Sequence, residues 1–154
     1  MAEVFFYHLT DRPLDQALPE LLEKTLERGW RALVRGTEAA RLARLDTLLW
    51  TRRQEDFLPH GLAGGEHDAA QPILLTTASE NTNLADILML VDGARVDLDE
   101  VAGFTRACVM FDGHDDQQLS AAREDWKAVS DAGLTAQYWA QDDGRWVKKA
   151  ESGG

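Results

Sequence analysis

Short apolar runs along the chain predict the strands of a sheet. The first run, at residues 4–7, is β-branched and aromatic. Two later runs, at 73–77 and 87–91, are continuously apolar, as strands buried on both faces of a parallel sheet are. Further strands are predicted at residues 31–35, 105–111, 134–141 and 145–149.

Between the predicted strands, apolar residues follow the period of a helix. Leucines at every fourth position from Leu14 to Leu26 form one stripe, and Gly29 is a natural C-terminal stop. Thr37 is placed to cap a second helix. The apolar positions of this helix are Leu42, Leu45 and Leu49.

The later part of the chain predicts a long helix followed by a hairpin. The acidic pair at 115–116 opens a helix that runs through Ala132, and acidic residues at a helix start complement its dipole. The Asp-Gly step at 143–144 separates the last two predicted strands and favours a tight turn. A short helix is predicted at 98–103 and a loop at 51–71.

These elements predict a single three-layer α/β domain with a mostly parallel sheet at residues 1–150, followed by a disordered tail at 151–154. The chain has 154 residues, of which 44% are hydrophobic and 28% charged, near the average of a globular domain. The lone cysteine, Cys108, lies within an apolar run and is expected to be a buried thiol.

The net charge of −11 argues against strong direct binding of nucleic acid, because such binders carry a basic face. No apolar stretch approaches the roughly 18 residues of a membrane span, so no membrane partner is expected. The first residues have no basic region or cleavage signal, and a cytoplasmic location is the expectation.

Motifs of enzymes are missing from the sequence. It contains no G-x-G-x-x-G, no G-x-x-x-x-G-K-[ST], no H-E-x-x-H and no G-x-S-x-G. We therefore expect no catalytic residues, no cofactor, no nucleotide site and no metal site. One alternative stays open in the predicted loop, which is either a solvated polar segment or a metal site made by His60, Glu66, His67 and Asp68.

A first group of candidate binding residues lies at the end of the second predicted helix. Trp50 ends this helix, Phe57 follows before a proline, and the same helix carries Arg41 and Arg44. Trp50 and Phe57 either close the core under the loop or line a partly open pocket. Aromatic residues and arginines are enriched where proteins bind one another.

A second group lies on the late helix. Arg123, Trp126 and Lys127 stand at i, i+3 and i+4 and so share one neighbourhood. In one interpretation Trp126 belongs to the core and the cations pair with Glu124 or Asp131. In another, the cations receive a carboxylate beside an apolar wall formed by Trp126. A third places a face of Ala121, Ala128 and Ala132 on the sheet and turns Trp126 outward.

These two groups lie within a pattern that resembles a known family. Residues 45–62, read as L-D-x-L-L-W-x-x-x-x-E-x-F-L-P-H-G-L, look like the central signature of the chi subunit of bacterial DNA polymerase III. The late block at 122–133, A-R-E-x-W-K-x-x-x-x-A-G, is similar to the last major helix of that family, and the opening Phe5-Phe6-Tyr7 is similar to its start.

The resemblance implies a Rossmann-like α/β/α fold without a nucleotide site, and a non-catalytic accessory subunit of the polymerase holoenzyme. It implies two partners, which are the psi subunit of the clamp loader and the acidic C-terminal tail of single-stranded-DNA-binding protein, ending in Pro-Phe. Arg123 and Lys127 would receive the tail carboxylates. The remaining residues implied for this site are Trp126, Trp50, Phe57 and Arg44.

The sequence departs from the family pattern at two cationic positions, where it has Leu119 and Ser130, and it extends beyond the pattern at 145–149. For psi, the apolar residues Leu98, Val101 and Phe104 recur at intervals of three and are the predicted contact, although they could also simply cover the core.

Two other classes of function remain as alternatives. A small α/β hydrolase or nucleotide-dependent enzyme would hold a cluster of perturbed acids, or bind phosphate, at the carboxyl ends of the strands. A direct binder of single-stranded DNA would interleave basic residues with exposed aromatics along a groove.

Overall fold

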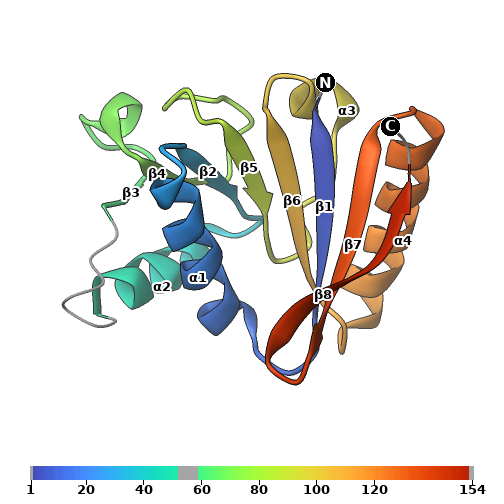
Figure 1. Cartoon of the computed structure of the whole chain (residues 1–154). Coiled ribbons are helices and arrows are strands. Elements are labelled where there is room, and N and C mark those ends of the chain that lie inside the picture. Colours follow the sequence, from blue (N-terminus) through green and yellow to red (C-terminus); the bar gives the residue numbers. More distant parts are fainter. Residues whose placement is uncertain (1, 52–58, 153–154) are drawn as a thin grey trace.

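The computed structural model describes residues 2–51 and 59–152 (Figure 1). Within them the strands are β1 (Glu3–Leu9), β2 (Ala32–Arg35), β3 (Gly61–Leu62), β4 (Ile73–Thr76), β5 (Ile87–Leu90), β6 (Arg106–Asp112), β7 (Thr135–Asp142) and β8 (Arg145–Ser152). The helices are α1 (Leu14–Glu27), α2 (Ala39–Thr51), α3 (Leu98–Val101) and α4 (Asp116–Asp131), with a 3-10 turn, η2, at Asp68–Ala70.

The described strands form one sheet in the order β3-β4-β2-β5-β6-β1-β7-β8, and only β8 runs antiparallel to its neighbour. Helices α1 and α2 pack on one face, which we call the α1 face, while α3 and α4 pack on the other, which we call the α4 face (Figure 1). The predicted three-layer α/β domain with a mostly parallel sheet is therefore confirmed.

Strand β1 lies near the middle of the sheet and divides its side chains between the two faces. Phe5 and Tyr7 belong to the core under α1 and α2, whereas Val4 and Phe6 belong to the core under α3 and α4. Successive side chains of a strand point to opposite faces, so a run that is apolar throughout must be covered on both sides. The N-terminal apolar run predicted a strand here, but not that it would be buried on both faces.

Helix α4 begins and ends as the sequence predicts. The carboxylate of Asp115 accepts hydrogen bonds from the backbone N–H groups of Gln117 and Gln118 and so caps the first turn. The helix ends before Gly133, which has a φ of +78°. In the turn between β7 and β8, Asp143 and Gly144 both have positive φ, as the predicted tight hairpin requires.

Three expectations were wrong in detail. Thr37 does not cap α2, which begins two residues later at Ala39: its hydroxyl donates to the backbone oxygen of Asp92 and accepts from no N–H of α2 within the described residues. The segment expected to be a loop contains β3 and η2. Strand β8 continues through Glu151 and Ser152, which pair with β7, so these two residues are not a disordered tail.

One side chain from the last hairpin closes the loop between β1 and α1. The side-chain oxygen of Gln141, in β7, accepts hydrogen bonds from the backbone N–H groups of Thr10, Asp11 and Arg12 at 2.8, 2.8 and 3.0 Å. In nucleotide-binding α/β proteins, the amides at this point of the fold hold a phosphate. Here an internal amide oxygen already uses them.

No helix in the part of the chain that the structure describes is long and apolar enough to cross a membrane.

We expect Gln141→Ala to lower the free energy of unfolding by about 1–3 kcal/mol, because three backbone donors lose their acceptor. Gln141→Glu keeps an acceptor oxygen and should recover much of the loss. Gln117 is exposed on α4, so Gln117→Ala is the matched control and should change stability by less than about 0.5 kcal/mol. Urea denaturation measures all three, and equal stability of Gln141→Ala and Gln117→Ala would contradict this role.

Candidate functional site

A hollow of about 500 Å³ opens on the α4 face, between α4 and the strands β1, β6, β7 and β8. We call it the α4 hollow. It is built from strand side chains that point to the α4 face and from one side of α4. Its lining residues are Phe6, His8, Phe111, Leu119, Ala122, Arg123, Trp126, Tyr138, Lys149 and Ala150.

Trp126 forms both a core contact and a wall of the α4 hollow. Its ring packs edge-on against Phe6 at 5.4 Å between centroids and against Tyr138 at 6.2 Å. The indole remains partly accessible, while Ala122 and Val129 of the same stripe are buried. The interpretation that turns a face of alanines to the sheet is wrong, since Ala128 is exposed.

The cations of α4 are not paired with the acids of α4. Arg123 and Lys127 are both exposed, and within the described residues neither forms an ion pair. The expected partner Glu124 instead binds Arg95 at 3.0 Å. Arg123 lines the α4 hollow, and Lys127 follows one turn later on the helix.

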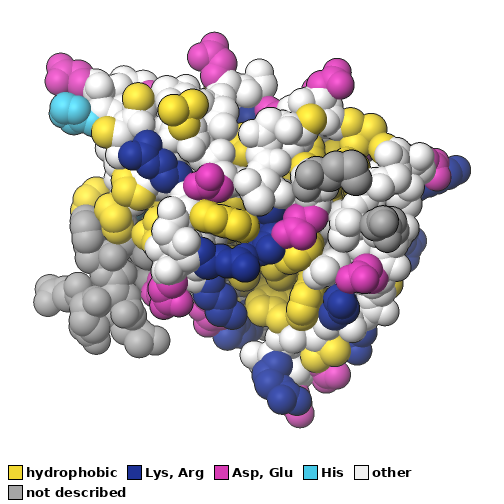
Figure 2. Space-filling model, turned by 45° about the horizontal axis from the view of Figure 1, so that its top comes forward, with side chains coloured by type: hydrophobic (Ala, Val, Ile, Leu, Met, Phe, Trp, Pro, Cys, Tyr) yellow, Lys and Arg dark blue, Asp and Glu magenta, His cyan; other side chains and the backbone are white. Residues whose placement is uncertain are grey.

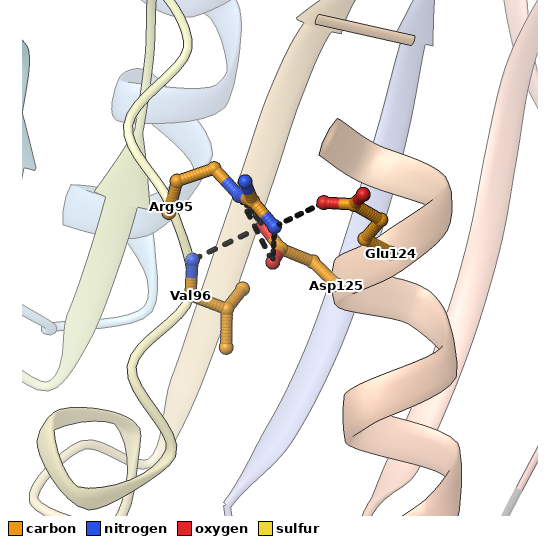
Figure 3. A network of polar contacts seen from close by, with 4 residues as sticks. All are labelled: Arg95, Val96, Glu124 and Asp125. Carbon is orange, nitrogen blue, oxygen red and sulfur yellow. Dashed lines mark hydrogen bonds and ion pairs between the residues drawn. The ribbon is translucent and has the colours of Figure 1, made fainter. Parts of the chain in front are cut away.

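Arg95 binds two neighbouring acids of α4, Glu124 and Asp125 (Figure 3). Its guanidinium donates to both carboxylate oxygens of Asp125, which is buried, and to the carboxylate of Glu124. The backbone N–H of Val96 also donates to Asp125, at 3.1 Å. These contacts engage the two acids with Arg95 and not with the cations of α4.

His8 brings a titratable group into the α4 hollow. Its ring stacks on Phe111 at 4.9 Å, and its Nδ1 shares a hydrogen bond with the hydroxyl of Tyr138. Burial, followed by the charge interactions with His114 and Arg123, lowers the pKa of His8 below its usual 6.5. The imidazole is therefore neutral at pH 7.

The structure does not bring all predicted tail-binding residues together. Arg44 and Trp50 lie on α2, on the α1 face, whereas Arg123, Trp126 and Lys127 lie on α4 across the sheet (Figure 1). Trp50 is 52% exposed and its ring lies 4.5 Å from that of His60. Phe57 lies outside the described residues. The structure therefore does not group the predicted residues of α2 and α4 around one ligand.

The predicted psi contact is mostly internal. Val101 is fully buried and Phe104 is 7% exposed, and both belong to the core under α3 and α4. Only Leu98, at 37%, reaches the surface. These residues recur at intervals of three because they cover the core. Together they do not form an exposed apolar patch.

Several lining residues of the hollow were missed from the sequence. His8, Phe111 and Tyr138 occupy alternate positions on their strands, on the same side as Phe6. Their spacing could have placed them on one face once β1 was known to pair with β6 and β7. Lys149 carried no local signal.

A smaller cavity, of about 280 Å³, lies at the carboxyl ends of the strands, and its lining includes Arg12, Arg41 and Asp112. Asp92 lines this cavity, where burial raises the pKa of its carboxyl, and it binds Arg41 at 3.1 Å. Within the described residues there is no group of three or more His, Cys, Asp or Glu that could hold a metal ion. In the expected loop, the carboxylate of Asp68 accepts from the N–H groups of Gly64 and Gly65.

On the α1 face, hydrophobic side chains lie exposed in a hollow beside Lys and Arg (Figure 2). A cavity of about 360 Å³ opens there between α1 and the strands β1, β5 and β6. Arg28 lies over the ring of Trp30, and Arg106 lies over that of Phe5 while also pairing with Glu3. These cations are thus engaged with the protein itself.

Comparison with known proteins identifies the family. The model described as DNA polymerase III chi subunit, HolC, matches residues 1–137. DNA polymerase III subunit chi of Escherichia coli (strain K12) is 30% identical over 122 residues, which cover 79% of this chain and 81% of that protein. A probable DNA polymerase III subunit chi of Rickettsia prowazekii is 28% identical over 91 residues, 59% of this chain and 55% of that protein.

DNA polymerase III subunit chi of Pseudomonas aeruginosa is 34% identical over 74 residues, which cover 48% of this chain. In these matches the chain spans about half the length of the Rickettsia and Pseudomonas proteins, at 55% and 51%. The chain belongs to the DNA polymerase III chi subunit family.

Proposed function

We propose that this protein is a non-catalytic accessory subunit of bacterial DNA polymerase III. In this role it links the clamp loader, through the psi subunit, to the C-terminal tail of single-stranded-DNA-binding protein, and it acts in the cytoplasm. Membership of the chi family supports the polymerase assignment. The observation that carries the tail contact is the presence beside the apolar α4 hollow of Arg123 and Lys127, which form no ion pair with the described residues.

The α4 hollow has the chemistry that an acidic tail ending in Pro-Phe requires. Trp126 and Phe111 offer an apolar surface for a phenyl ring, and Arg123 lies among the same lining residues. Lys127 stands one turn further along α4. A chain with a net charge of −11 repels an acidic peptide overall, so binding must depend on these local cations.

This proposal omits Trp50 and Arg44 from the tail site because α2 lies across the sheet. The tail would contact Arg123, Trp126 and Lys127 on one side. The far side of the hollow is formed by β7 and β8, which carry Tyr138 and Ala150.

We expect Arg123→Ala to weaken binding of an acidic tail peptide about tenfold or more, since a charge-assisted hydrogen bond to a carboxylate is lost. Trp126→Ala should also weaken it, through lost apolar contact. The matched control is Lys24→Ala, an exposed cation on the α1 face, which should leave affinity unchanged.

Fluorescence anisotropy with a labelled peptide measures these affinities, and moderate salt should weaken the complex because exposed charges are screened. A peptide without its terminal phenylalanine should bind less tightly. If that peptide bound as well as the full one, or if folded Arg123→Ala bound normally, the tail site would be rejected.

The neutral state of His8 predicts a pH dependence of this binding. A bound carboxylate favours the charged imidazole, so binding takes up a proton and affinity should rise as pH falls from 7.5 towards 5.5. In the free protein the lowered pKa of His8 has the opposite consequence, because stability is lost as pH falls below 6.5. His8→Asn should flatten both profiles, whereas His67→Gln, at an exposed position outside the α4 hollow, should retain them. Calorimetric titrations at several pH values measure the pH dependence of binding. A wild-type affinity that does not change with pH would contradict the role of His8.

The exposed position of Leu98 allows a separate prediction for the binding of psi. Leu98→Glu should leave the fold intact and weaken capture of psi, since only this residue of the predicted contact is exposed. Val101→Ala should instead lower the free energy of unfolding by about 1–2 kcal/mol, because it opens space in the core. Pull-down with psi and thermal unfolding distinguish the two effects. Unchanged psi capture by folded Leu98→Glu would exclude this surface.

A further inference from the structure

We propose that strand β8 supplies a second cationic wall to the α4 hollow, and that Lys149 is a specificity-determining residue for an acidic peptide carboxylate there. This inference rests on the proposed function of the hollow and deepens it. Lys149 lies beyond residues 1–137, which the family model matches, so it is a feature of this chain and not of the family pattern.

The position of Lys149 follows from an irregularity in the last hairpin. In the antiparallel register Trp139 lies opposite Lys148 and Tyr138 lies opposite Ala150, which leaves Lys149 as an extra residue on β8. An inserted residue of this kind changes the direction in which side chains point, and such bulges occur next to functional sites. Here Lys149 and Ala150 both line the α4 hollow.

The hollow is thereby enclosed by cations from two elements. Arg123 extends from α4, and Lys149 extends from the strand on the other side of the lining. Trp126 and Tyr138 line the same hollow and make the apolar part of its surface. A carboxylate that enters beside Trp126 can therefore be approached by a positive charge from either side.

Lys149 has no strong internal partner that would hold it away from a ligand. Its ammonium lies 3.9 Å from the carboxylate of Asp142, and both side chains are about half exposed or more, at 48% and 65%. Exposed pairs of this length contribute little stability. The neighbouring Lys148 differs, since it pairs with Glu151 at 3.1 Å and lies opposite Trp139, whose side chain packs on the α1 face.

Lys149 also compensates for an apolar residue on α4. Leu119 lines the same hollow one turn before Arg123, at a position where the family resemblance led us to expect a cation. A lysine on β8 restores a positive charge to the hollow from the opposite wall. A competing explanation is that Lys148 and Lys149 only protect the sheet edge from aggregation, as lysines on edge strands do.

The test compares Lys149→Gln with Lys148→Gln in the full chain, by anisotropy with an acidic peptide ending in Pro-Phe. We expect Lys149→Gln to weaken binding about fivefold, with a smaller dependence on salt, and Lys148→Gln to stay within about twofold of wild type. Lys149→Arg should bind normally. Adding Leu119→Lys to Lys149→Gln should recover affinity, because the charge returns to the same hollow.

Each contrary result has a distinct meaning. If Arg123→Gln weakens binding but Lys149→Gln does not, the β8 wall is rejected and the tail site stands. If Lys148→Gln and Lys149→Gln weaken binding equally, the effect is one of general charge and the inference also fails. If none of these cations affects binding, both the tail site and the inference fall. Circular dichroism melts confirm that every variant is folded.

Discussion

The carboxylate of Asp125 fixes how α4 lies against the sheet. It is buried, and a buried charge is stable only where hydrogen bonds and an opposite charge replace water. Arg95 and the N–H of Val96 provide these contacts from the segment that precedes α3 (Figure 3). Rotating the helix would break them, so the helix is held with Trp126 towards the strands and Arg123 at the edge of the hollow.

This arrangement separates the charges of an acidic protein. The acids next to the cations on α4 are bound by Arg95, while Arg123 and Lys127 have no ion pair among the described residues. The local potential at the hollow can therefore differ in sign from the net charge of the chain. Attraction over a few ångströms exceeds repulsion from charges that lie beyond the screening length of the solvent. An acidic protein can therefore bind an acidic peptide at a site where cations lie close to the ligand.

Much of the fold could be predicted from the sequence because its signals are local. Leucines at helical spacing placed α1, Asp115 marked the start of α4, and the Asp-Gly step at 143–144 marked the last hairpin. The grouping of side chains across the sheet could not be predicted in this way. Trp50 and Trp126 both belong to family-like motifs, but the faces on which they lie depend on crossover connections that no single segment encodes.

The same limit explains the fate of the other candidate residues. Leu98, Val101 and Phe104 share a spacing that suits a docking surface and a core equally well, and only burial distinguishes the two. Lys149 depends on a register shift between two strands, which is a property of pairing and not of either strand alone. Gln141 had no motif, although its side chain takes the place of a ligand at the β1–α1 loop.

The interior place of β1 has a consequence for the order in which the chain acquires structure. Strand β1 precedes both of its neighbours, β6 and β7, along the chain, and Glu3 pairs with Arg106 on one side and Thr135 on the other. Both pairings join residues that lie far apart in the sequence, and such contacts form slowly because a long loop must close first. Until they form, the apolar run from Val4 to Tyr7 has unpaired edges, which favour aggregation.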